Sequence, residues 1–155
     1  MVELMVSKSI PYSRPTICKE EMKTTLECLA SDFIGHGDLA LEFEKQLAKI
    51  LTKGKVKATP SGTLSFFLIL KLLKVKPQDE IILPSYVPKS LLNPILYLGA
   101  IPVLVDVSLQ DQSPLLEEVQ KKITSKTKAL LVSHLFGLPV KVSVYKSLGL
   151  PIIEH

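Results

Sequence analysis

Residues 79–107 read DEIILPSYVPKSLLNPILYLGAIPVLVDV. This segment contains two short aliphatic runs, Glu80–Leu83 and Pro102–Val107, with a helical pattern over Lys89–Leu98 between them. Strands that are covered by helices on both faces have such nearly continuous aliphatic runs, and alternation of strand and helix gives parallel strands. The segment therefore predicts one unit of a parallel α/β sheet.

The same alternation continues on both sides of this unit. Further strands are predicted at Val56–Thr59, Ala129–Ser133 and Pro151–Glu154. Further helices are predicted at Lys19–Ala30, from Asp38 to just before Gly54, and at Gly62–Lys74, Pro114–Thr124 and Lys141–Leu148. Asp38 and Ser113 are the residue types that cap helix N-termini. We expect a single α/β domain over residues 1–155, with a mainly parallel sheet and flanking helices.

Composition excludes membrane-spanning and secreted classes of protein. The chain has 155 residues, of which 46% are hydrophobic, but no run approaches the roughly 20 apolar residues that span a bilayer. The stretch Met1–Ser9 has an acidic Glu3 and no basic start, unlike a secretion signal. We therefore expect a cytoplasmic protein.

Charge and cysteine content argue against nucleic-acid binding and metal clusters. The net charge of +4 comes almost entirely from scattered lysines, and Arg14 is the one arginine, whereas nucleic-acid readers favour clustered arginines. Cys18 and Cys28 lie in one predicted helix without a CxxC motif. We expect them to be reduced, partly buried thiols.

A turn at Ser61-Gly62-Thr63 follows a predicted strand and opens a predicted helix. Its amides and hydroxyls could bind a phosphate, because helix N-termini favour anions. An ordinary helix cap would use the same residues. From these residues alone both interpretations stay open, and the cap is the commoner one.

His134 follows a predicted strand and Asp106 closes one, at the ends where ligand-binding groups of α/β sheets gather. His134 could contact a ligand or act as a base, or it could be a hydrogen-bonded structural residue. Asp106 has no second carboxylate at a useful spacing. A hydrolase triad of Ser61, His134 and Asp106 is rejected because no G-x-S-x-G elbow is present.

The ordered series of motifs is more specific than any one of them. In chain order these are Pro15-Thr16-Ile17, Gly35 and Gly37, Leu41-Glu42-Phe43-Glu44, Ser61-Gly62-Thr63, Asp79–Tyr86, Gly99–Val103 with Asp106, Ile123-Thr124, Lys126–Ala129, His134–Gly137 and Pro151–Glu154. The series resembles the N-terminal half of the DegT/DnrJ/EryC1/StrS family, which are aminotransferases dependent on pyridoxal 5'-phosphate (PLP) that act on nucleotide-linked keto sugars.

The resemblance implies an aspartate-aminotransferase-like fold (PLP fold type I), of which this chain corresponds to part of the large domain. It also implies that Ser61, Gly62, Thr63 and Leu64 hold the cofactor phosphate. Residue 155 corresponds to the position that pairs with the pyridine nitrogen.

The sequence departs from the family pattern at two positions. Pro88 stands where family members have a flat group that stacks on the pyridine ring, and proline has no π face. His155 stands where the family has an aspartate, which keeps the pyridine nitrogen protonated. In addition, no lysine here matches the family's Schiff-base motif, so no catalytic residue is assigned.

The resemblance therefore implies a family whose members transfer an amino group to a keto sugar, in surface-polysaccharide or antibiotic-sugar biosynthesis. We expect this chain to be catalytically incomplete, to bind PLP weakly or not at all, and to form a homo-oligomer or pair with a complementing chain. The alternative is a noncatalytic binding or oligomerisation module derived from the same fold. A nucleotide-binding domain is a weaker alternative, because no G-x-G-x-x-G or Walker motif is present.

Overall fold

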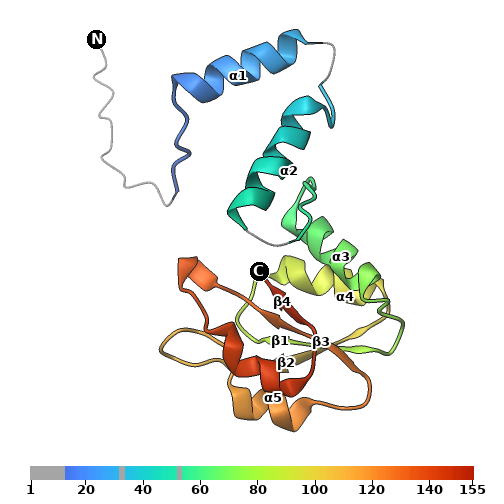
Figure 1. Ribbon diagram of the computed structural model, residues 1–155. Helices are drawn as coiled ribbons and strands as arrows, with labels where there is room; N and C mark the ends of the chain where they lie inside the picture. Colours follow the sequence, from blue (N-terminus) through green and yellow to red (C-terminus); the bar gives the residue numbers. More distant parts are fainter. Residues whose placement is uncertain (1–12, 32–33, 52–53) are drawn as a thin grey trace, which may run out of the picture. The chain divides into compact units, whose positions relative to one another are not determined.

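The computed structural model describes residues 13–31, 34–51 and 54–155 (Figure 1). The chain forms two compact units, the first ending at Ala58 and the second beginning at Thr59. The stretch Met1–Ser9, for which no secretion signal is expected, lies outside the described residues. The single domain over residues 1–155 stays a prediction.

The second unit is built on a parallel sheet. Its strands are β1 (Glu80–Pro84), β2 (Ile101–Val105), β3 (Thr127–Val132) and β4 (Ile152–Glu154). Within the described residues their order is β2-β1-β3-β4, and every neighbouring pair is parallel. The parallel α/β sheet predicted from residues 79–107 is confirmed, and the carboxyl ends of the strands meet at one edge.

Helices cover both faces of this sheet (Figure 1). Helix α3 (Gly62–Leu72) and α4 (Leu92–Tyr97), which follows a 3₁₀ turn η1 (Lys89–Leu91), pack on one face. Helix α5 (Leu116–Lys122) and the 3₁₀ helix η3 (Val142–Leu148) pack on the other. A short 3₁₀ turn, η2 (Leu135–Gly137), follows β3.

The faces of the sheet follow the twofold alternation of a strand. Ile81, Leu131 and Ile153 belong to the core under α3 and α4. Ile82 and Leu130 belong to the core under α5 and η3. The two aliphatic cores explain why the strands have nearly continuous apolar sequences, and the alternation fixes which side chains reach each face.

The first unit contains α1 (Lys19–Ala30) and α2 (Asp38–Ile50). The bounds of α1 are those predicted, whereas the N-cap of α2 is Gly37 rather than Asp38. None of the described helices combines the length and hydropathy needed to cross a bilayer.

Two further sequence-based predictions of secondary structure were wrong. Val56–Thr59 is not a strand, because the Ala58 N–H, which a ladder would use, donates to the Glu44 side chain at 2.9 Å. Helix α5 begins at Leu116 with Leu115 as its N-cap, so Ser113 caps nothing. Pro114 instead forms an antiparallel bridge with Val107, which keeps it outside the helix.

Candidate functional site

The Ser61-Gly62-Thr63 turn opens α3 as the sequence predicts. Ser61 has an extended backbone and is the N-cap, and its hydroxyl accepts a hydrogen bond from the Leu64 N–H at 3.2 Å. Thr59 donates to the Ser61 carbonyl at 3.1 Å, which fixes the entry to the turn. Serine favours this position because its oxygen satisfies an amide that has no partner inside the helix. The interpretation as a helix cap is therefore confirmed.

His155 lies against the start of this helix. The His155 N–H donates to the Val132 carbonyl at 2.9 Å, which extends the pairing of β4 with β3 by one residue. Strand alternation then places the His155 side chain on the same face as Ile153, which is the face covered by α3. A Cβ atom added at Gly62 would lie 3.9 Å from His155 Nε2. The structure thus brings together two predicted site residues that are far apart in the sequence.

This arrangement fits an anion. The N–H groups of Gly62 and Thr63 belong to the first turn of α3, where helix geometry provides no acceptor. Since Gly62 lacks a side chain, an anion can approach these amides closely, and the His155 ring borders the same space. The Leu64 N–H, in contrast, already donates to Ser61. Gly62, Thr63 and His155 therefore offer the donors, with the Ser61 and Thr63 hydroxyls beside them.

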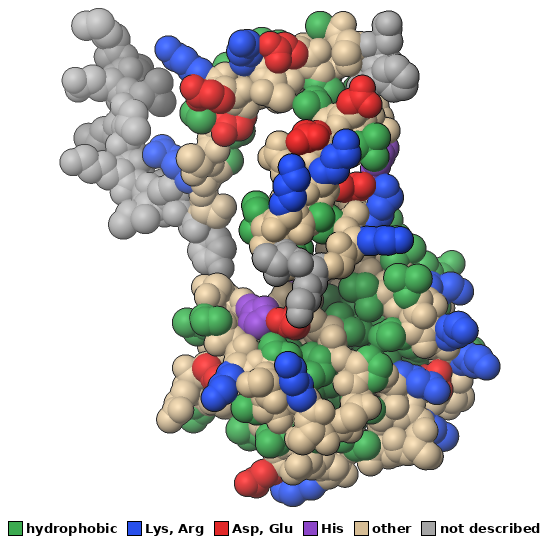
Figure 2. Space-filling view, in the orientation of Figure 1, with side chains coloured by type: hydrophobic (Ala, Val, Ile, Leu, Met, Phe, Trp, Pro, Cys, Tyr) green, Lys and Arg blue, Asp and Glu red, His purple; other side chains and the backbone are tan. Residues whose placement is uncertain are grey.

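The turn also opens onto a groove between α3 and α4. The groove has a volume of about 410 Å³, and its lining residues are Ser61, Thr63, Leu64, Phe67, Asn93, Pro94 and Tyr97. Sequence analysis missed Asn93 and Tyr97. These two residues are four positions apart on a predicted helix and therefore share one face of it, which is the sequence feature that could have indicated them. Figure 2 shows hydrophobic side chains gathered over this part of the second unit.

His134 has its ring held on both sides. Its Nδ1 accepts from the Val140 N–H at 3.0 Å, so the ring proton lies on Nε2, which donates to Glu154 at 3.1 Å. Its backbone N–H donates to the His155 carbonyl at 2.8 Å. His134 is therefore a hydrogen-bonded residue of the sheet edge, with an acidic partner that the sequence did not reveal.

A hydrolase triad does not form among the described residues. Both ring nitrogens of His134 are engaged by Val140 and Glu154, so neither is available to Ser61 or Asp106. Asp106 is exposed, and its backbone carbonyl accepts from Leu115 at 3.0 Å. The rejection of a triad is confirmed.

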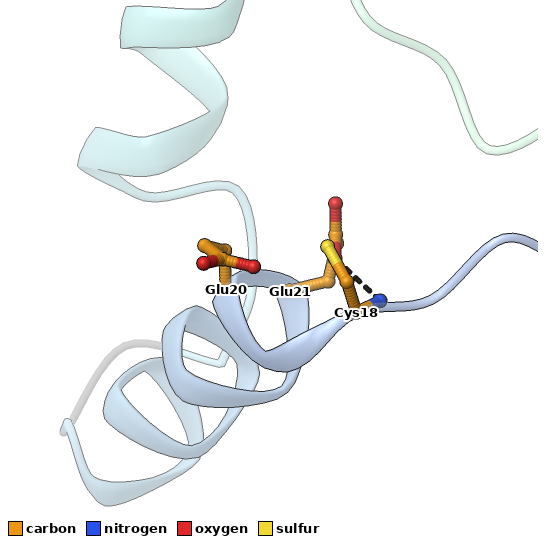
Figure 3. A group of neighbouring side chains, drawn as sticks. All are labelled: Cys18, Glu20 and Glu21. Carbon is orange, nitrogen blue, oxygen red and sulfur yellow. Dashed lines mark hydrogen bonds between the residues drawn. The ribbon is translucent and has the colours of Figure 1, made fainter.

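Cys18, Glu20 and Glu21 lie together at the start of α1 (Figure 3). The Glu21 carboxylate accepts from the Cys18 N–H at 2.8 Å and from its thiol, in a capping box. This hydrogen bond raises the pKa of the Cys18 thiol and lowers that of the Glu21 carboxyl. Helix capping accounts for the group. Cys28 is partly buried as predicted, whereas Cys18 is exposed.

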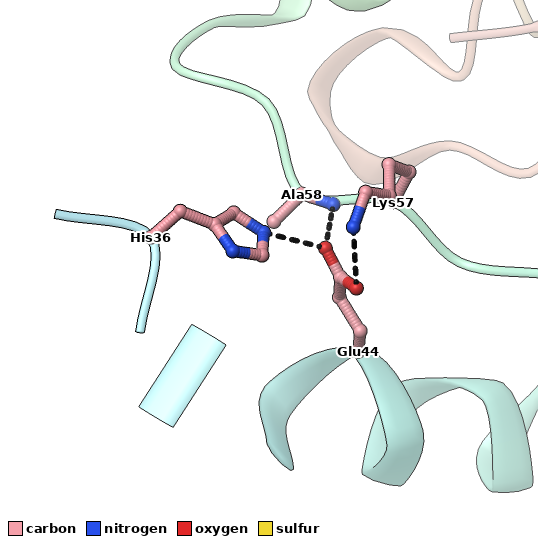
Figure 4. Close-up of polar contacts among 4 residues, drawn as sticks. All are labelled: His36, Glu44, Lys57 and Ala58. Atoms are coloured by element: carbon pink, nitrogen blue, oxygen red, sulfur yellow. Dashed lines mark hydrogen bonds and ion pairs between the residues drawn. The ribbon is translucent and has the colours of Figure 1, made fainter. Parts of the chain in front are cut away.

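Among the described acids of the first unit, Glu44 has the most strongly lowered pKa, and its contacts are drawn in Figure 4. It accepts from the Ala58 N–H at 2.9 Å and contacts Lys57 Nζ and His36 Nε2, each at 3.1 Å. The Ala58 N–H is the main cause of a pKa lowered to about 2, and His36 and Lys57 add to it against the opposing effect of desolvation. The contacts with Glu44 hold Lys57 and Ala58, which precede the Ser61-Gly62-Thr63 turn in the chain.

Sequence analysis quoted Glu44 only as part of a motif. A signal was nevertheless present, because Glu44 lies four residues after Ala40 and four before Ala48, which places a charge on the less exposed face of α2.

Comparison with known proteins identifies the class. The sequence profile of the DegT/DnrJ/EryC1/StrS aminotransferase family matches residues 15–154. This chain belongs to that family.

Solved structures support the fold. Spr1654 from Streptococcus pneumoniae, named as a sugar aminotransferase and solved in its PLP form, matches with a TM-score of 0.86 and 29% identity over 90% of this chain and 36% of its own. The aminotransferase TlmJ from Streptoalloteichus hindustanus matches with a TM-score of 0.83 and 31% identity over 94% of this chain and 42% of its own.

The Escherichia coli GDP-4-keto-6-deoxy-D-mannose-3-dehydratase, solved with hydrated PLP, shares the fold with a TM-score of 0.86 at 24% identity. The match covers 94% of this chain and 40% of the dehydratase chain. The predicted fold, part of a PLP fold type I large domain, is confirmed. The chain spans 36–42% of the length of these three proteins.

Proposed function

We propose that this chain is the cofactor-phosphate-binding part of a PLP-dependent aminotransferase that acts on a nucleotide-linked keto sugar, in surface-polysaccharide or antibiotic-sugar biosynthesis. The observation that carries this proposal is the position of the His155 ring beside the start of α3, where Nε2 would lie 3.9 Å from a Cβ atom added at Gly62. Family membership and the sugar aminotransferase named among the solved relatives support it.

Each residue of the turn has a distinct task in this proposal. The Gly62 and Thr63 amides donate to the phosphate, and the Ser61 hydroxyl, while accepting from Leu64, can donate its own proton to the same group. Leu64 fixes the Ser61 rotamer through that bond. When bound, PLP supplies a ring that withdraws electrons from the substrate carbon.

His155 has a different task from the aspartate that the family places at this position. Its Nε2 faces Gly62 and therefore the phosphate turn. We assign His155 to the phosphate, as a donor through Nε2. The substitution removes the carboxylate that would keep the pyridine nitrogen protonated and leaves a ring nitrogen that can donate to an anion.

These 155 residues do not catalyse amino transfer by themselves in this proposal. No lysine is assigned to the cofactor, and Pro88 offers no ring face. In this proposal the Schiff-base lysine and the group that stacks on the pyridine ring come from outside residues 1–155. The departures at Pro88 and His155 favour, as a second candidate, a noncatalytic module that keeps the phosphate turn.

Exposed apolar residues support assembly. Large apolar side chains of α3 and α4 remain exposed, namely Leu68, Leu72, Leu96 and Tyr97, and such surfaces promote pairing between chains. We expect a dimer or larger assembly in light scattering at micromolar concentration. A clean monomer would contradict this part of the proposal.

An NMR titration with inorganic phosphate and with free PLP tests the site. Both ligands should shift the amides of Ser61–Leu64 and the His155 ring with a dissociation constant in the millimolar range, on the order of 4 kcal/mol. His134→Ala is the matched control, because its ring faces Glu154 rather than Gly62, and it should leave the affinity nearly unchanged. Phosphate that shifts residues around His134 but not Ser61–Leu64 would contradict the proposal.

A further inference from the structure

Two exposed aromatic rings lie together beyond the carboxyl ends of β1 and β3. Tyr86 follows β1 and Phe136 lies in the η2 turn after β3. Their ring centroids are 6.4 Å apart with an interplanar angle of 53°. Tyr86 is 53% exposed and Phe136 is 71% exposed. Contact between the rings therefore leaves most of both exposed at the edge where α/β sheets bind ligands.

The backbone at Phe136 is strained. Its φ of 54° and ψ of 22° lie in the left-handed region, which is uncommon for a bulky residue and costs energy. Burial of the ring does not offset this cost, because the side chain is mostly exposed. Glycine would adopt the same turn without strain. Because a phenylalanine in this backbone conformation costs conformational free energy that burial does not offset, its exposed ring points to a binding role.

A carboxylate comes from the same edge. The η2 turn begins directly after His134, whose Nε2 donates to Glu154 at the end of β4. Glu154 is exposed. The edge thus combines aromatic faces with an acceptor for hydroxyl groups.

We propose that Tyr86 and Phe136 bind the sugar ring of the substrate, with the Glu154 carboxylate accepting from its hydroxyls; this rests on the proposed function. The C–H face of a sugar ring is apolar and packs on an aromatic face, whereas its hydroxyls need polar partners. The two rings contact each other, with centroids 6.4 Å apart, so the sugar packs on their exposed faces and not between them.

Saturation-transfer NMR with N-acetylglucosamine tests this site. The sugar carries no phosphate and no base, so its binding does not depend on the Ser61–Leu64 turn. We expect millimolar binding, with ring C–H protons receiving saturation and the Tyr86 and Phe136 resonances shifting. Sugar binding without any phosphate response would refute the cofactor proposal alone, and phosphate binding without a sugar response would refute the sugar site alone.

Variants at one position separate ring loss from unfolding. Phe136→Gly removes the ring and relieves the strain, so the protein should stay folded while affinity falls about five- to tenfold, the value of one aromatic contact. Phe136→Tyr keeps the ring and should keep the affinity. Phe43→Ala, which removes an exposed ring of α2 in the first unit, is the control and should have no effect. Equal affinity in the Phe136→Gly variant, or shifts of Tyr86 and Phe136 by uridine monophosphate but not by the sugar, would overturn the proposal.

Discussion

Replacing Gly62 with alanine should raise stability and lower anion affinity in the same protein. Gly62 is the first residue of α3, and its φ lies outside the left-handed region. The new Cβ would lie 3.9 Å from His155 Nε2, an ordinary van der Waals distance, so the structure accommodates the methyl group without a clash. The methyl carbon would, however, occupy the space in which an anion oxygen must lie to reach both the helix amides and His155.

The two effects have calculable sizes. Alanine at a compatible backbone position stabilises by about 0.4–1 kcal/mol, because the unfolded chain has less freedom to lose. Loss of close approach should weaken phosphate binding at least tenfold, or about 1.4 kcal/mol. Gly62→Val, with its bulkier branched side chain, should abolish binding.

Thermal unfolding and a phosphate titration on the same sample measure both quantities. Gly99→Ala is the matched control: at φ of 68°, and with a Cβ 3.2 Å from the Pro77 side chain, it should destabilise by about 1–2 kcal/mol without changing phosphate affinity. If the Gly62→Ala variant binds phosphate as tightly as the parent chain, the amides at Gly62 and Thr63 are not the anion site. If Gly62→Ala loses both stability and binding, unfolding explains the loss instead.

Three further outcomes are expected. Because the pKa of Glu44 is lowered to about 2 from an ordinary 4.5, its stabilising contribution should be complete above about pH 5 and should disappear as the pH falls towards 2; acid titration of Glu44→Gln should lack this part of the transition, and an unchanged profile would contradict it. Tyr145→Phe removes a buried hydroxyl that donates to the Pro114 carbonyl at 2.6 Å and should cost about 1–2 kcal/mol in denaturant unfolding, whereas a neutral variant would show that the bond contributes little. Borohydride treatment with PLP should give no stoichiometric adduct, and mass spectrometry that finds one pyridoxyl group on one lysine would show that the chain holds a catalytic lysine.

Local pattern predicted most of the second unit. The runs at Glu80–Leu83 and Ala129–Ser133 became β1 and β3, because aliphatic residues covered on both faces leave a continuous signal in the sequence. The prediction failed at Val56–Thr59, where a distant acid takes a backbone N–H. It also failed at Ser113, because pairing of Pro114 with Val107 took precedence over helix-start residues. In both places a contact distant in sequence or a bridge overrode local preference.

The candidate site was predictable as a list of residues but not as a geometry. Each member of the turn and His155 could be named from the family resemblance, yet their proximity depends on how β4 pairs with β3 and on where α3 crosses the sheet. The link from His134 to Glu154 likewise joins two strand ends that no local pattern connects. The partners of Glu44 could not be predicted from the sequence, because its main partner is the backbone N–H of Ala58, and any residue except proline supplies such a group.

The end of β4 joins the two proposed subsites through strand alternation. Ile153 points into the core under α3, so Glu154 must point to the opposite face and His155 must return to the α3 side. His155 therefore faces the phosphate turn, while Glu154 faces His134 and the η2 turn that carries Phe136. Three backbone and side-chain bonds hold this end to β3: His155 N–H to Val132, His134 N–H to His155, and His134 Nε2 to Glu154. A register shift of one residue would exchange the two faces, directing the carboxylate at the phosphate and the imidazole at the sugar hydroxyls, so the pairing of β3 with β4 is what assigns each group to its ligand.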